Sequence, residues 1–206
     1  MIAASLRGIA TAGIALGMIA LTAPAAQAQS GEVASVGPAS PLETSREYLI
    51  KAALLFNFAK FAQWPATRFG NDSAPLRVCV IGADPFGSAL TSLAGKTVAN
   101  RTLAVLRITA AEKAAVCHIL FVSASEQPRL DQILDAVGSQ PILTVADMDQ
   151  FTGAGGIVAL KAADNRSRLE INVEAAEKAG LKLSSKLLRL SDTVDMQAVD
   201  QPESLI

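Results

Sequence analysis

The sequence predicts an α/β protein: a three-layer α/β/α domain in which helices cover both faces of a largely parallel sheet. Short apolar runs at 76–81, 118–123 and 141–146 are rich in Val, Ile, Leu and Phe, as strands buried on both faces are. The segment from Glu126 to Val137 lies between two of these runs and repeats apolar residues at helical spacing. Strands that alternate with helices in this way are typical of a parallel sheet.

The run 76–81 organises the rest of the chain, because it ends at Gly82 and leads directly into Asp84 and Pro85. An aspartate followed by proline is typical of a helix start. A first strand that turns into a helix raises the question of a nucleotide phosphate. The dinucleotide fingerprint needs three closely spaced glycines, whereas this turn has Gly82 and Gly87 with a carboxylate between them. We therefore favour a structural turn and expect no cofactor.

The other elements follow from apolar periodicity, caps and breakers. The segment from Glu47 to Trp64 is apolar almost all round, so most of it should be buried, with a second contact surface as the alternative. The remaining expected elements are a helix at 84–93, a strand at 103–108, a helix at 126–137, a short helix at 147–151, a hairpin of 156–161 with 168–172, and helices at 175–179 and 183–190.

The N-terminus has the pattern of a secretory signal peptide. Arg7 supplies the positive charge, 9–21 the apolar region and Ala26–Ala28 the small-residue cleavage site. We expect a signal peptide at residues 1–28, a flexible linker at 29–43, one domain at 44–194 and a disordered tail at 195–206. The protein is then exported to the periplasm. Loss of Arg7 changes the formal charge of −1 to −2, which argues against a nucleic-acid partner.

Cys79 and Cys117 are the only cysteines, and an exported protein meets an oxidising compartment. We expect a disulfide between them, with a stabilisation of roughly 4 kcal/mol by the chain-entropy estimate. The alternative is a metal site that uses both thiolates and His118. Cys117 and His118 are adjacent, and the side chains of adjacent residues on a strand point to opposite faces. The two thiolates and His118 would therefore form a poor tetrahedral site, and we expect no metal.

Candidate catalytic groups are few. His118 is the single histidine, at the start of an apolar run, where a structural role is favoured. There is no Gly-x-Ser-x-Gly nucleophile elbow. Asp147 and Asp149 stand at an expected helix start, where capping explains them better than a catalytic pair. We therefore expect no catalytic residues and a binding protein instead of an enzyme.

Several segments together resemble the YfiR family of exported bacterial proteins. These are 48–65 (YLIKAALLFNFAKFAQWP), 76–87 (LRVCVIGADPFG), 117–123 (CHILFVS), 142–147 (ILTVAD), Gly155-Gly156, 169–172 (LEIN) and 187–190 (LLRL). Each piece alone is ordinary, but the ordered set covers 48–194.

This resemblance implies a periplasmic repressor that binds the periplasmic part of an inner-membrane diguanylate cyclase, or another sensor enzyme, and lowers cyclic di-GMP. It also implies that an outer-membrane lipoprotein can sequester the repressor. Cys79 and Cys117 match the family's disulfide positions within the motifs CVIG and CHIL. A homodimer is an association that the sequence leaves open.

Two other functions are alternatives. A small-molecule sensor would use the carboxyl ends of the strands, the usual ligand site in open α/β sheets. An enzyme would depend on His118. For a repressor, the candidate partner-binding residues near the terminal hairpin are Phe151, Leu169 and Ile171, with the alternative that all three are core.

Overall fold

The computed structural model describes residues 41–163, 166–190 and 194–195. The expected signal peptide at 1–28, most of the linker and the tail from residue 196 lie outside the described residues, so their boundaries stay predictions. The expected linker ended at residue 43, but the first helix, α1 (Pro41–Phe61), already begins at Pro41.

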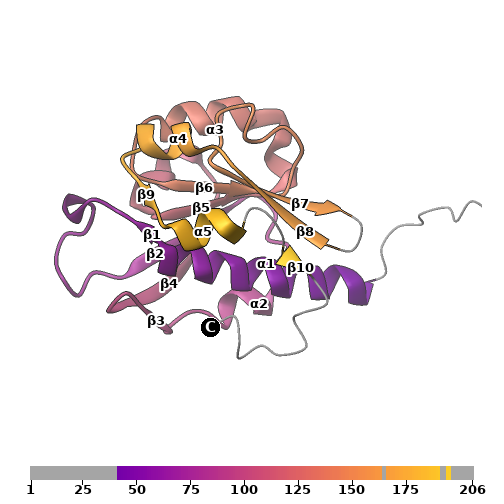
Figure 1. Ribbon diagram of the computed structural model, residues 1–206, viewed down its shortest axis with the longest axis horizontal. Helices are drawn as coiled ribbons and strands as arrows, with labels where there is room; N and C mark the ends of the chain where they lie inside the picture. The colour runs from indigo at the N-terminus through magenta and orange to yellow at the C-terminus, as the bar shows by residue number, and fades with distance from the viewer. Residues whose placement is uncertain (1–40, 164–165, 191–193, 196–206) are drawn as a thin grey trace, which may run out of the picture. The chain divides into compact units, whose positions relative to one another are not determined.

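The described residues form one α/β unit with a main sheet in the order β10-β8-β7-β6-β5-β2-β4-β3 (Figure 1). Its strands are, in chain order, β2 (Leu76–Ile81), β3 (Thr97–Val98), β4 (Arg101–Ile108), β5 (Ile119–Val122), β6 (Leu143–Ala146), β7 (Val158–Ala163), β8 (Arg166–Ile171) and β10 (Val194–Asp195). A separate short ladder pairs β1 (Ala62–Gln63) with β9 (Lys182–Leu183).

The sheet is mixed, which corrects the expectation of a largely parallel sheet. Strands β4, β2, β5, β6 and β7 run parallel in the centre. The pairs β3–β4, β7–β8 and β8–β10 are antiparallel. The pairs β3–β4 and β7–β8 are antiparallel because short connections can join only antiparallel neighbours, whereas β8 and β10 are far apart in the chain. Between β3 and β4 the two-residue turn Ala99-Asn100 has positive φ at both positions, the geometry that tight hairpins need.

Alternate side chains of the central strands divide between two cores. Val78 and Phe121 pack in the core that contains α1, whereas Ile81 and Leu120 pack in the core that contains α3 (Leu130–Val137). In Figure 1, α1 and α3 lie on opposite sides of the sheet. The α/β class is confirmed, and the full three-layer arrangement remains a prediction.

The expected helix at 47–64 ends at Phe61 instead, because the next residues pair with β9 as β1. The run 124–137 is a 3₁₀ segment, η3 (Ala124–Arg129), followed by α3, which ends before Gly138 as expected. The expected helix at 84–93 shortens to α2 (Ser88–Thr91), and 147–151 forms turns instead of a helix. The other short elements are η1 (Ala66–Arg68), η2 (Ala111–Val116), α4 (Val173–Lys178) and α5 (Ser185–Leu190).

Candidate functional site

The carboxyl edge of the parallel strands is where open α/β sheets bind ligands, above all where neighbouring connections leave in opposite directions. In this sheet that point lies between β2 and β5, because β4 follows on one side of β2 and β5 on the other. It is filled by the protein's own side chains. A Cβ atom at Gly82 would lie 2.5 Å from Ser125 Oγ and 2.7 Å from Glu126 Cγ. The Ala83 backbone N–H donates to Ser125 Oγ at 2.9 Å. A phosphate could reach this backbone only if Ser125 and Glu126 moved away.

Asp84 is part of this turn and does not cap α2, which corrects its expected role. Its Oδ1 accepts the Phe86 backbone N–H at 2.8 Å, while Oδ2 lies 2.6 Å from the Arg107 guanidinium. Gly87, with φ of 55°, precedes the helix. Asp84 therefore links the turn after β2 to β4 and is not aimed at a ligand.

Asp147, at the carboxyl end of β6, receives two donors from α1. Lys51 Nζ lies 2.6 Å from Asp147 Oδ2, and the Tyr48 hydroxyl donates to the same oxygen at 2.8 Å. Lys51 is 4% exposed and also lies 2.5 Å from Glu47 Oε1. Burial and, next, the charge of Asp147 raise the pKa of Tyr48, so the hydroxyl stays protonated and donates.

The expected capping role of Asp147 is therefore wrong. The carboxylate is the buried anchor of α1, and no helix starts behind it. Asp149 lies on the exposed turn that follows. A lysine inside the apolar pattern of 47–64 was the one signal for this contact, because a buried lysine requires an acidic partner.

Cys117 and His118 lie at the amino end of β5, and Cys79 lies within the neighbouring strand β2. The two cysteines form a disulfide with their Cα atoms 5.8 Å apart, and both are fully buried. Neither sulfur is then a thiolate, so the alternative metal site with His118 does not form.

His118 has a structural environment. Its Nδ1 accepts the Arg77 backbone N–H at 3.0 Å, and its ring stacks on Phe69 with centroids 4.5 Å apart. Burial, followed by the charges of Arg68, Arg77 and Arg101, lowers the pKa of His118 to about 4. The imidazole is therefore neutral at neutral pH. It is 2% exposed, so it is out of reach of a substrate.

The expected exposure of the hairpin residues needs correction. Phe151 is 0% and Leu169 4% exposed, and Ile171 is partly buried against the core that contains α1. The Phe151 ring packs on Gly156, where a Cβ atom would lie 2.2 Å from the ring. Phe151 and Leu169 are core residues in this fold. Their role in binding a partner stays a prediction that their burial does not support.

Exposed large apolar side chains occur instead on α1, where Leu42 is 83% and Leu49 55% exposed. The two positions fall on one face of the helix, because seven residues are close to two turns. We call these two side chains the leucine pair. One turn further along the same face, Ala53 is partly exposed. Sequence reasoning raised a second contact surface for this helix but did not single out these residues.

No helix among the described residues is both long enough and apolar enough to cross a membrane. No curated protein matches the chain significantly. The family described as YfiR/HmsC-like matches residues 48–192, from α1 to the end of α5, which is well over half of the chain. The chain therefore belongs to the YfiR/HmsC-like family, a periplasmic regulatory family that is associated with cyclic di-GMP signalling and is not known as a catalytic one.

Proposed function

We propose that this protein is a periplasmic repressor. It binds the periplasmic domain of an inner-membrane diguanylate cyclase, holds the enzyme inactive and so lowers cyclic di-GMP and surface adhesion. An outer-membrane lipoprotein that sequesters the repressor would relieve this inhibition. Family membership supports a regulatory role with a signalling partner.

The leucine pair is the observation that carries the choice of a contact surface. Leu42 and Leu49 lie about two turns apart on one face of α1, with the exposed Ser45 and Arg46 between them, and we infer that a partner covers this face. On other sides of α1, Lys51 and Tyr48 contact Asp147 and Phe58 is fully buried. The helix cannot rotate to bury the pair without breaking these contacts, so Leu42 and Leu49 remain available outside.

Burial of the leucine pair would supply a large part of the energy that repression requires. A shift from mostly active to mostly inactive cyclase needs a difference in affinity of about 5.5 kcal/mol between the two states. Complete burial of one leucine side chain contributes about 1.5–3 kcal/mol. Leu42 is 83% and Leu49 55% exposed, so burial of their remaining surface against only one state of the cyclase would supply about 2–4 kcal/mol, and further contacts must supply the rest.

The test compares Leu49→Asp and Leu42→Asp with Val173→Asp, an apolar position on α4 that is 42% exposed. The mature protein, with each substitution, is used to capture the cyclase from solubilised membranes, and cellular cyclic di-GMP is measured in parallel. We expect the α1 substitutions to weaken capture by at least about tenfold and to raise cyclic di-GMP, without a change in melting temperature. Capture that survives both α1 substitutions would place the interface elsewhere. Loss of self-association without loss of capture would assign the leucine pair to a homodimer.

Export is part of the same proposal. Cleavage after Ala28 makes Gln29 the first residue of the mature protein. The intact mass of material from the periplasm checks this, and a retained leader would contradict the localisation.

A further inference from the structure

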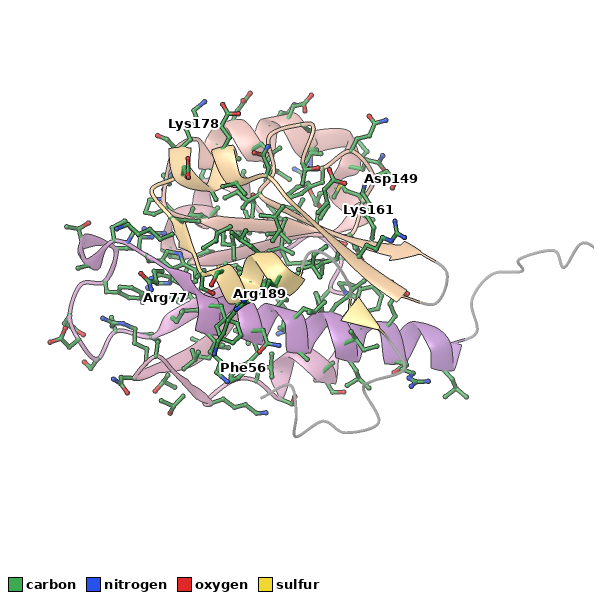
Figure 2. All side chains as sticks on the ribbon, viewed as in Figure 1. Phe56, Arg77, Asp149, Lys161, Lys178 and Arg189 are labelled. Carbon is green, nitrogen blue, oxygen red and sulfur yellow. A yellow bond between two sulfur atoms is a disulfide. The ribbon has the colours of Figure 1, made fainter. Side chains whose placement is uncertain are left out.

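A cavity of about 540 Å³ opens at the carboxyl edge of β5 and β6, next to the β7–β8 hairpin. Gln127, Asp147, Asp149, Lys161 and Arg168 supply its polar lining. Figure 2 shows Asp149 and Lys161 on the same side of the domain. The volume falls in the range of small-molecule sites, and the position is the usual ligand side of an open α/β sheet. The filled crevice between β2 and β5 is a separate place.

Two cations of this cavity stand directly opposite each other. Lys161 on β7 and Arg168 on β8 are register partners, an arrangement that destabilises a strand pair unless the charges are compensated. Lys161 Nζ is compensated by Glu170 Oε2 at 2.6 Å. Within the described part of the chain, Arg168 forms no ion pair and no side-chain hydrogen bond.

Of the two carboxylates of the cavity, one is likewise paired within the protein and the other is not. Asp147 is occupied by Lys51 and Tyr48. Asp149 has no ion pair with a described residue. Its charge contributes to the raised pKa of Lys161, but less than the hydrogen bond from Lys161 to Glu170 does. Arg168 and Asp149 are therefore opposite charges that line one cavity without pairing with each other.

We propose that this cavity binds a small zwitterion, with its oxyanion on the Arg168 guanidinium and its ammonium group on the Asp149 carboxylate. A guanidinium binds a carboxylate or a phosphate through two parallel hydrogen bonds, and both are stronger than bonds between neutral groups. The lining as a whole is close to neutral, since Lys51 and Glu170 offset Asp147 and Lys161. A ligand with one charge only would leave Arg168 or Asp149 uncompensated. This site is independent of the proposed repressor function.

The oxyanion of the ligand could be a carboxylate or a phosphate, and the choice of probe ligands distinguishes the two. The mature protein is titrated by calorimetry with individual α-amino acids, with phosphoethanolamine, and with acetate and ethylamine as singly charged analogues. We expect at least one zwitterion to bind at least about tenfold more tightly than either analogue. A carboxylate source is indicated if an amino acid binds, and a phosphate source if phosphoethanolamine does. Absence of binding by every zwitterion up to about 10 mM, or equal binding of an analogue, would overturn the proposal.

Substitutions locate the site. Arg168→Gln and Asp149→Asn remove one charge each from exposed positions, so the fold should be retained, which circular dichroism and melting check. Each should weaken zwitterion binding by at least about tenfold. The matched controls are Arg189→Gln on α5 and Asp72→Asn in the exposed loop before β2, neither of which lines the cavity. Binding that is unaffected by Arg168→Gln and Asp149→Asn, or weakened equally by the controls, would contradict this location.

Discussion

The two edges of the parallel strands hold the first segment of the domain by different interactions. At the carboxyl edge, α1 is attached by charge, since Lys51 and Tyr48 both reach Asp147. At the amino edge, the segment after α1 is attached by hydrogen bonds to backbone carbonyls. The Trp64 indole donates to the His118 carbonyl at 3.1 Å, and Arg68 donates to the Cys117 carbonyl at 2.6 Å.

The two edges also differ in burial and charge. Near the amino edge, the disulfide is buried, and so is the histidine, whose lowered pKa keeps it neutral. The carboxyl edge keeps charged groups in place and leaves an open cavity beside them. Stability at the carboxyl edge should therefore respond to loss of one charge, and stability at the amino edge to reduction and acid. Four experiments test this contrast.

The largest effect should come from Lys51→Ala. Asp147 would remain buried without its cation, and breaking one side of a buried ion pair costs about 3–5 kcal/mol. Unfolding in denaturant measures it, with Lys60→Ala, an exposed lysine of the same helix, as the control. The double change Lys51→Met with Asp147→Leu should recover most of the loss, because the buried carboxylate is removed with its cation, and Glu47, the other partner of Lys51, keeps 27% of its side chain exposed to water. If the double variant lost as much free energy of unfolding as Lys51→Ala, the ion pair would not be what attaches α1.

Removal of the disulfide should have the next largest effect. Cys79→Ala opens a loop between residues 38 positions apart and should lower the free energy of unfolding by about 2–5 kcal/mol. Thiol labelling of the denatured, unreduced protein should find neither cysteine free in the parent chain. The effects of Cys79→Ala and Cys117→Ala should not add in the double variant, since both remove one bond. Labelling of both cysteines in the parent would reject the bridge.

Acid should weaken the amino edge through His118. Its pKa is about 4 in the folded protein and 6.5 in the unfolded chain, so the unfolded state binds more protons between these values. The contribution of neutral His118 to the free energy of unfolding is fully present above pH 6.5. It is lost as the pH falls toward 4, by at most about 3 kcal/mol. His118→Asn keeps a hydrogen-bond acceptor and should remove this part of the pH dependence. Because His118 is the single histidine, its NMR titration is unambiguous. A midpoint near 6.5 would contradict its burial as a neutral group.

The smallest effect concerns the filled crevice at the carboxyl edge. Gly82→Ala combines a φ of 92° with a Cβ atom 2.5 Å from Ser125 Oγ, so a loss of about 1–3 kcal/mol is expected. Gly87→Ala, with φ of 55° and no atom within 4 Å, is the control for backbone strain alone and should cost less. Equal losses would mean that Ser125 and Glu126 move aside easily and that the crevice can open.

Local pattern by itself determined the α/β class, the central strands and the hairpin. The runs at 76–81, 118–123 and 141–146 form β2, β5 and β6 within two residues of their expected bounds. Such runs are good indicators because strands buried on both faces are nearly continuous in Val, Ile and Leu. The pairing of Cys79 with Cys117 followed from their number and from the expected compartment. Family motifs in order were enough to indicate the regulatory family.

Only the tertiary structure decided what the isolated polar and aromatic residues do. Asp147 resembled a cap, and Phe151 and Leu169 resembled an interface, because a local pattern does not show which distant group covers a side chain. Lys51 lies 96 positions before Asp147, and Gly156, which has no side chain, leaves room for the Phe151 ring. The edge strands β3 and β10 escaped prediction because two residues carry no periodicity. Burial and ion pairing depend on contacts between segments far apart in the chain, and these exist only once the sheet has formed.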